Sequence, residues 1–184
     1  MCAALKRDGK KAAFTGCRLE EVCQLTVADL REQQANGSRV TCFAIHDEGK
    51  NSLKNKSSKR LVPVHSALVR AGLLDYHDAL PKDGLLFAGL VRRESKGGKL
   101  HARVSELFRK RLVVLGIKRK GKDSRSFRHS VATALEASGV QETDAARVLG
   151  HRIGGMSYGV YSSGPGLKVL AGIVEQINYE GLRV

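Results

Sequence analysis

The chain has few cysteines and no long apolar run, and both absences limit what it can be. No run of about 18 apolar residues occurs, so we expect no membrane span. The stretch from Met1 to Lys11 carries four Lys or Arg residues and too short an apolar run for a signal peptide. None of the cysteines forms a C-x-x-C pair, so we predict no zinc site and reduced thiols in a cytosol-like compartment. The four cysteines are Cys2, Cys17, Cys23 and Cys42.

Acidic residues are also scarce. The 184 residues include 32 Lys or Arg against 18 Asp or Glu, a formal charge of +14. This imbalance predicts a polyanionic partner, most commonly nucleic acid. A basic ribosomal or membrane-surface protein can carry the same charge, so the class of partner has to be inferred from sequence motifs. The length suits one domain, and a hydrophobic fraction of 42% is enough for a real core.

Apolar spacing predicts a mixed fold. A helix is expected from Arg18 to Leu30, ahead of a turn at Asn36-Gly37. Two strands are expected at Val40–Ile45 and Leu61–Val64, joined through the basic turn Lys54–Arg60. Glycine and proline then separate a series of helices. The helices are predicted at Ser66–Ala79, His101–Leu115, Ser126–Ser138, Glu142–Leu149 and Gly166–Ile177. The predicted class is α+β, mainly α-helical with a small antiparallel β-sheet.

The residues from Arg109 to Arg128, here called the basic segment, hold nine Lys or Arg and the single acidic residue Asp123. Most such charge runs are solvated surfaces. Given the charge of the whole chain, a surface that faces phosphates is at least as good an interpretation.

Three short segments carry the candidate chemistry. Thr15–Glu21 places Arg18 at the start of a helix, where free N–H groups already favour an anion. Ser126–Ser130 opens a later helix and contains Arg128. Leu149-Gly150-His151 is followed, ten residues after the histidine, by Tyr161.

The order and spacing of these segments resemble the tyrosine recombinase (phage integrase) family. That family's pattern runs T-G-x-R-x-x-E, a lysine in a β-turn ahead of a V-P strand, H-x-x-R-H, L-G-H and then tyrosine. The resemblance covers about Phe14 to Gly166, nearly the whole chain. It implies site-specific recombination or integration of double-stranded DNA through a 3′-phosphotyrosine intermediate.

The resemblance also implies the site residues. Arg18 and Arg128 match the two catalytic arginines, His151 the late histidine and Tyr161 the nucleophile. Lys54 matches the turn lysine, the general acid for the leaving 5′ oxygen. Planar guanidinium groups suit bidentate phosphate contact, and cations lower the cost of a phenolate.

Two of these assignments have rivals. Lys54 lies nine residues before Pro63, which fits the family spacing of eight or nine better than Lys56, seven residues before it. The family's spacing of about nine from histidine to tyrosine favours Tyr161 over Tyr158.

The chain departs from the family in two ways. Arg125 stands where the family has the first histidine, and a guanidinium cannot accept a proton. We therefore include Arg125 among the candidate catalytic residues and expect a slow enzyme. The chain also begins almost at the first motif, so we expect residues 1–184 to be a single catalytic domain that lacks the N-terminal core-DNA-binding domain. We expect residues 166–184 to be a C-terminal tail segment. Its stretch Leu167–Tyr179 is apolar at helical spacing. The resemblance implies that this face docks on a neighbouring subunit, although such a face more commonly folds back on its own core.

No D-x-D or D-D-E cluster occurs in these segments, so we expect chemistry without metal or other cofactor. The resemblance implies double-stranded DNA as the partner, self-association into a tetrameric synapse, no membrane, and a cytoplasmic, nucleoid-associated protein encoded by a bacterium or phage. Two alternatives stay open: a degenerate integrase fragment that binds DNA without catalysis, and a type IB topoisomerase-like nicking enzyme.

Overall fold

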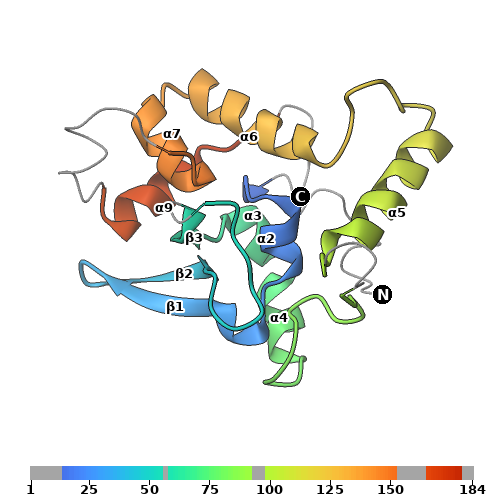
Figure 1. Ribbon diagram of the computed structural model, residues 1–184. Coiled ribbons are helices and arrows are strands. Elements are labelled where there is room, and N and C mark those ends of the chain that lie inside the picture. Colours follow the sequence, from blue (N-terminus) through green and yellow to red (C-terminus); the bar gives the residue numbers. More distant parts are fainter. Residues whose placement is uncertain (1–13, 56–57, 93–97, 153–164, 180–184) are drawn as a thin grey trace.

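The computed structural model describes residues 14–55, 58–92, 98–152 and 165–179. Its strands are β1 (Leu30–Ala35), β2 (Ser38–Ile45) and β3 (Arg60–Pro63), which form one antiparallel sheet in the order β1-β2-β3. Helices occupy about half of the remaining described chain (Figure 1). The predicted class, α+β with a small antiparallel sheet, is confirmed.

The predicted turn at Asn36-Gly37 closes a hairpin between β1 and β2, with Ala35 opposite Ser38. Both turn residues have positive φ, 48° for Asn36 and 75° for Gly37. Such turns suit the right-handed twist of a two-residue hairpin, and asparagine followed by glycine is the sequence that tolerates them best.

The helix predicted from Arg18 to Leu30 is wrong in its second half. The structure has a short helix α2 (Leu19–Cys23), a 3₁₀ turn η2 (Val27–Asp29) and then β1. The carboxylate of Asp29 accepts hydrogen bonds from the Thr26 N–H and Oγ1, both at 2.8 Å. This local capping competes with a continuous helix. The strand itself was missed because β1 is an edge strand and, after Leu30, buries no residue fully.

The predicted helix Ser66–Ala79 is two helices, α3 (Ser66–Arg70) and α4 (Leu73–Asp78). The helix is interrupted at Gly72, whose φ of 81° lies in the left-handed region that glycine reaches at least cost. The other predicted helices are confirmed to within two residues at their starts and ends. They are α5 (His101–Val114), α6 (Arg125–Ala137), α7 (Glu142–Leu149) and α9 (Leu167–Glu175).

The main core lies between the sheet and helices α3, α6, α7 and α9. Helix α9 packs on β3, β2 and α7, α6 packs on α7, and α2 contacts α5. As a result the start of α2, the start of β3 and the end of α7 meet in the middle of the molecule (Figure 1). The ends of these three elements carry the candidate site.

Helix α9 folds back on the chain's own core. Ile173, Val174 and Ile177 are buried there. The Glu175 carboxylate accepts hydrogen bonds from the N–H and hydroxyl of Ser66 at 2.6 and 2.7 Å. The described part of the C-terminal tail therefore packs on its own domain, the more common of the two expected arrangements.

Within the described ranges, no helix has both the length and the apolar character needed to cross a membrane. Over the same part of the chain, no three His, Cys, Asp or Glu side chains are grouped so that they could hold a metal ion.

Candidate active site

Arg18 caps the start of α2 and is held by Glu21, one turn later. Its backbone N–H donates to Oε2 of Glu21 at 2.9 Å, and its Nη1 donates to Oε1 at 2.6 Å. The Glu21 side chain is only 3% exposed, whereas that of Arg18 is 26% exposed. The T-G-x-R-x-x-E string therefore builds a buried carboxylate that orients a partly exposed arginine.

Gly16 brings the second arginine to the same place. Its carbonyl oxygen accepts a hydrogen bond from Nη1 of Arg128 in α6 at 2.8 Å. Its φ is 62°, and a Cβ at this position would lie 2.7 Å from Cδ2 of Leu149. Only a glycine allows this turn to lie so close to the end of α7.

Arg128 has an unsatisfied donor. Its Nη2 is buried and finds no hydrogen-bond partner among the described residues. Burial, reinforced by the positive charges of Arg18 and Arg60, lowers the pKa of Arg128 to about 10. A buried donor without an acceptor is costly, so this geometry favours an anion bound next to Arg128.

His151 follows directly on the end of α7. Gly150 ends that helix in the left-handed conformation, and the His151 N–H closes the turn on the Ala146 carbonyl at 2.8 Å. Partial burial and the nearby charges of Arg128 and Arg18 lower the pKa of His151. These effects favour the neutral ring, which offers one donor and one acceptor.

The structure brings these residues to one place: Arg18 contacts the carbonyl of Gly150, the residue before His151, and Arg128 contacts the carbonyl of Gly16, two residues before Arg18. Lys54 lies on an exposed bend, four residues before Ser58, whose hydroxyl accepts a hydrogen bond from Arg18 at 3.0 Å. The turn that carries Lys54 therefore ends at the site. Tyr161, and the rivals Lys56 and Tyr158, lie outside the described residues.

Arg125 is not drawn into this group. It is the first residue of α6, its side chain is 82% exposed, and its Nη2 pairs with Oδ2 of Asp123 at 2.8 Å. Its role in catalysis remains a prediction.

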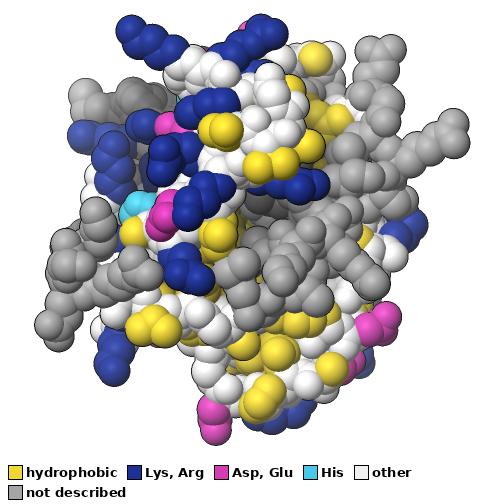
Figure 2. Space-filling view, turned by 90° about the vertical axis from the view of Figure 1, so that its right-hand side faces the viewer, with side chains coloured by type: hydrophobic (Ala, Val, Ile, Leu, Met, Phe, Trp, Pro, Cys, Tyr) yellow, Lys and Arg dark blue, Asp and Glu magenta, His cyan; other side chains and the backbone are white. Residues whose placement is uncertain are grey.

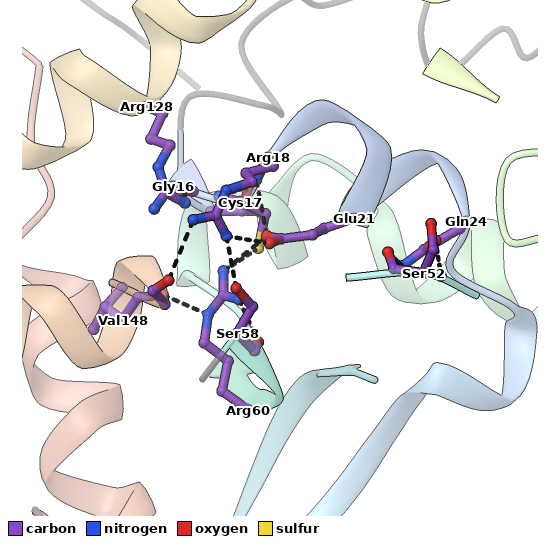
Figure 3. A network of polar contacts seen from close by, with 12 residues as sticks. Gly16, Cys17, Arg18, Glu21, Gln24, Ser52, Ser58, Arg60, Arg128 and Val148 are labelled. Carbon is purple, nitrogen blue, oxygen red and sulfur yellow. Dashed lines mark hydrogen bonds and ion pairs between the residues drawn. The ribbon is translucent and has the colours of Figure 1, made fainter. Parts of the chain in front are cut away.

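Sequence reasoning missed Arg60, which lies at the start of β3. Its side chain is 8% exposed and donates to Glu21 at 3.0 Å (Figure 3). The available signal was strand alternation: Arg60 shares a face of β3 with Val62, which is fully buried. An arginine that points into a core requires a buried acceptor, and Glu21 is that acceptor.

Comparisons with known proteins place the chain in a family and a fold. The model of the phage integrase family matches residues 11–163. A search of curated proteins gives no match. The integrase of mycobacterium phage Brujita has a similar structure, with a TM-score of 0.63 and 18% identity over 100% of this chain and 55% of its own.

XerH site-specific recombinase bound to its difH substrate is also similar in fold. The pre-cleavage complex gives a TM-score of 0.55 and 22% identity over 83% of this chain and 42% of XerH. The post-cleavage complex with palindromic difH gives 0.53 and 23% over 83% and 41%. The chain thus spans about half the length of these solved proteins. Since the family model covers most of the sequence, the chain belongs to the phage integrase family of tyrosine recombinases.

Proposed function

We propose that this chain is the catalytic domain of a tyrosine-type site-specific recombinase that cleaves and rejoins double-stranded DNA. The observation that carries the proposal is the buried Nη2 of Arg128, which has no hydrogen-bond partner among the described residues, on a side chain that contacts Gly16, two residues before Arg18. Two guanidinium groups that converge beside a histidine suit a phosphodiester, which has two non-bridging oxygens to hold.

The proposed reaction needs a nucleophile, cations and a proton donor. The phenol oxygen of Tyr161 attacks the scissile phosphorus, its proton leaves to solvent or a neighbouring base, and the bond to the 5′ oxygen breaks. Lys54 gives a proton to that leaving oxygen, so the products are a 3′-phosphotyrosine and a free 5′-hydroxyl. Arg18 and Arg128 stabilise the charge that develops on the non-bridging oxygens, and His151 hydrogen-bonds to the phosphate. Each of these roles can be supplied by a side chain of the protein, and we propose that no metal is required.

The basic segment supports duplex DNA as the partner. Most of its cations are exposed, from the end of α5 through the following loop to Arg125. Figure 2 views the molecule from the side of α5 and shows many Lys and Arg side chains in the upper and left parts of that face. We propose that these side chains contact DNA phosphates, so affinity should fall by about 0.9 log units per tenfold salt increase for each phosphate neutralised. We further propose assembly on DNA as a multimer, as in a recombination synapse.

The experiment is covalent trapping. A library of nicked duplexes with randomised central sequence is incubated with the protein in excess EDTA and stopped with SDS, and protein-linked DNA is counted and sequenced. We expect adducts enriched in a common sequence. Loss of adducts in EDTA would contradict the metal-free mechanism, and adducts without any sequence preference would favour the topoisomerase-like alternative.

One observation favours a non-catalytic alternative. Arg125 stands where the family has a proton-accepting histidine, and its guanidinium forms an ion pair with Asp123. If the protein shifts duplex DNA in a gel with steep salt dependence, but forms no adduct with any library member, it is a DNA-binding domain and not a recombinase.

A further inference from the structure

Arg60 and Arg18 contact the same three parts of the chain. We propose that Arg60 is a positioning residue of the active site: its buried guanidinium fixes Glu21, the end of the turn that carries Lys54, and the end of α7 ahead of His151, so that Arg18 stays available for the phosphate. This inference rests on the proposed function.

The first shared contact is Glu21. Its Oε1 accepts from Nη1 of Arg18 at 2.6 Å, and its Oε2 accepts from Nη2 of Arg60 at 3.0 Å (Figure 3). One carboxylate charge is thus divided between two guanidinium groups. Without Arg60, the whole charge of Glu21 would fall on Arg18 and oppose its attraction for a phosphate.

The second and third shared contacts lie at the end of the turn that carries Lys54 and at the end of α7. Ser58 offers its hydroxyl to Arg18 at 3.0 Å and its carbonyl to Nη1 of Arg60 at 2.8 Å. At the end of α7, Nε of Arg60 donates to the Val148 carbonyl at 2.9 Å, while Nη2 of Arg18 makes a long contact of 3.4 Å to the Gly150 carbonyl. The short bonds to α7 and the turn backbone therefore come from Arg60.

The burial of the two side chains separates their roles. Arg60 is 8% exposed and Arg18 is 26% exposed. A guanidinium has five N–H donors. Arg60 uses its three nitrogens on Val148, Ser58, Glu21 and a 3.5 Å contact to the Cys17 sulfur. Arg60 is thus committed to the protein, whereas Arg18 reaches the surface.

Gly150 gives independent support. A Cβ there would lie 2.5 Å from Nη1 and 2.8 Å from Cζ of Arg60, and the φ is 67°. The glycine of the L-G-H motif therefore leaves the space that the Arg60 guanidinium fills. Any side chain at 150 would push Arg60 away from the end of α7.

The charge of Arg60 reaches the groups of the site. Burial raises the pKa of Glu21, but the charge of Arg60, with hydrogen bonds from Arg60 and Arg18, outweighs this and leaves it lowered. For His151, burial and then the charges of Arg128, Arg18 and Arg60 lower the pKa, opposed by Glu21. Removing Arg60 should raise both pKa values.

The test compares Arg60→Gln and Arg60→Lys with Arg39→Gln, which removes the same charge from a 71% exposed arginine paired to Glu32. The titration of His151 is followed by NMR, with its signal assigned by loss in His151→Gln. We expect the His151 pKa to rise in Arg60→Gln, to rise less in Arg60→Lys, and to stay unchanged in Arg39→Gln. An unchanged value in Arg60→Gln, or an equal rise in Arg39→Gln, would overturn the proposal.

Single-turnover cleavage of a library member selected by trapping gives the second readout. A misplaced catalytic group commonly costs about 100-fold in rate, so Arg60→Gln should cleave about 10 to 100 times more slowly while DNA affinity changes within about threefold. Cleavage at the full rate would overturn the positioning role. If the unmodified protein forms no adduct, the proposed function fails, and the His151 titration still decides the role of Arg60.

If Arg60→Gln does not fold, Gly150→Ala takes its place, because it crowds Arg60 without removing its charge. Gly139→Ala is the control, since Gly139 also follows a helix, has a φ of 74° and has nothing within 4 Å of an added Cβ. We expect a larger fall in melting temperature and a shifted His151 pKa in Gly150→Ala only. Equal effects in the two variants would overturn the proposal.

Discussion

Replacing Gly16 with alanine should separate the packing of the site from its backbone strain. A residue with a Cβ at φ 62° has a left-handed backbone, which costs roughly 1–2 kcal/mol. The added Cβ would also lie 2.7 Å from Leu149 Cδ2 and 3.1 Å from Val131 Cγ1. Overpacking of this kind costs about 1–3 kcal/mol.

Gly49→Ala is the matched control. Gly49 has a φ of 63°, nearly that of Gly16, but nothing lies within 4 Å of its added Cβ. It should lose only the strain, roughly 1–2 kcal/mol. Gly16→Ala should lose about 2–5 kcal/mol in total. At about 2–4 °C per kcal/mol for a domain of this size, Gly16→Ala should melt several degrees below Gly49→Ala.

The assay is urea unfolding followed by circular dichroism, with melting temperature as the second measure. The same unfolding slope in both variants is needed for the comparison. An equal loss of stability in the two variants would refute the close packing of the Gly16 turn on α6 and α7, and with it the placement of Arg128 beside Arg18.

Three further predictions concern charge and proton transfer. The pKa of Glu21 is lowered in the folded protein, so its stabilisation is present above the unfolded carboxyl pKa and is lost as the pH falls through the folded value. Glu21→Gln should lower the free energy of unfolding by about 3–5 kcal/mol at neutral pH. It should also weaken the loss of stability at acid pH, here called the acid limb, measured by urea unfolding. An acid limb that is unchanged in this variant would show that Glu21 does not carry it. Lys54→Ala should slow cleavage by about 10²–10⁴-fold at similar DNA affinity. The control Lys59→Ala loses only an exposed ion pair with Glu48 and should cleave at the full rate. A full rate in Lys54→Ala would exclude Lys54 as the general acid. Arg125→His should raise the cleavage rate at neutral pH with similar or slightly weaker affinity, since histidine can accept a proton; slower cleavage would mean that Arg125 is a working part of the site.

Most of the helices could be predicted from apolar periodicity; α6, for example, buries Val131 and Leu135 at i, i+4 spacing. The strand β1 could not, because its exposed residues carry no alternation and the sequence around Leu30 continues a helical pattern locally. The break at Gly72 depends on a backbone conformation that a lone glycine permits but does not require.

The site was predictable where a motif fixes the residue type, as for Arg18, Arg128 and His151. Among the basic residues of the turn, only Arg60 is marked by the sequence, because strand alternation places it on the same face of β3 as the buried Val62. Arg60 ends a Lys-rich stretch, and its burial depends on Glu21 and Val148, which lie 39 and 88 residues away. Long-range pairings of this kind depend on where α2 and α7 lie relative to the start of β3.

The most direct test of the central claim is to identify the residue that becomes linked to DNA. Trapped adducts are digested with nuclease and protease, and the modified peptide is sequenced by mass spectrometry, alongside Tyr161→Phe and Tyr158→Phe. We predict a nucleotide attached through its 3′-phosphate to Tyr161, adducts from Tyr158→Phe, and none from a folded Tyr161→Phe. A nucleotide on another residue, or adducts retained in Tyr161→Phe, would contradict the account.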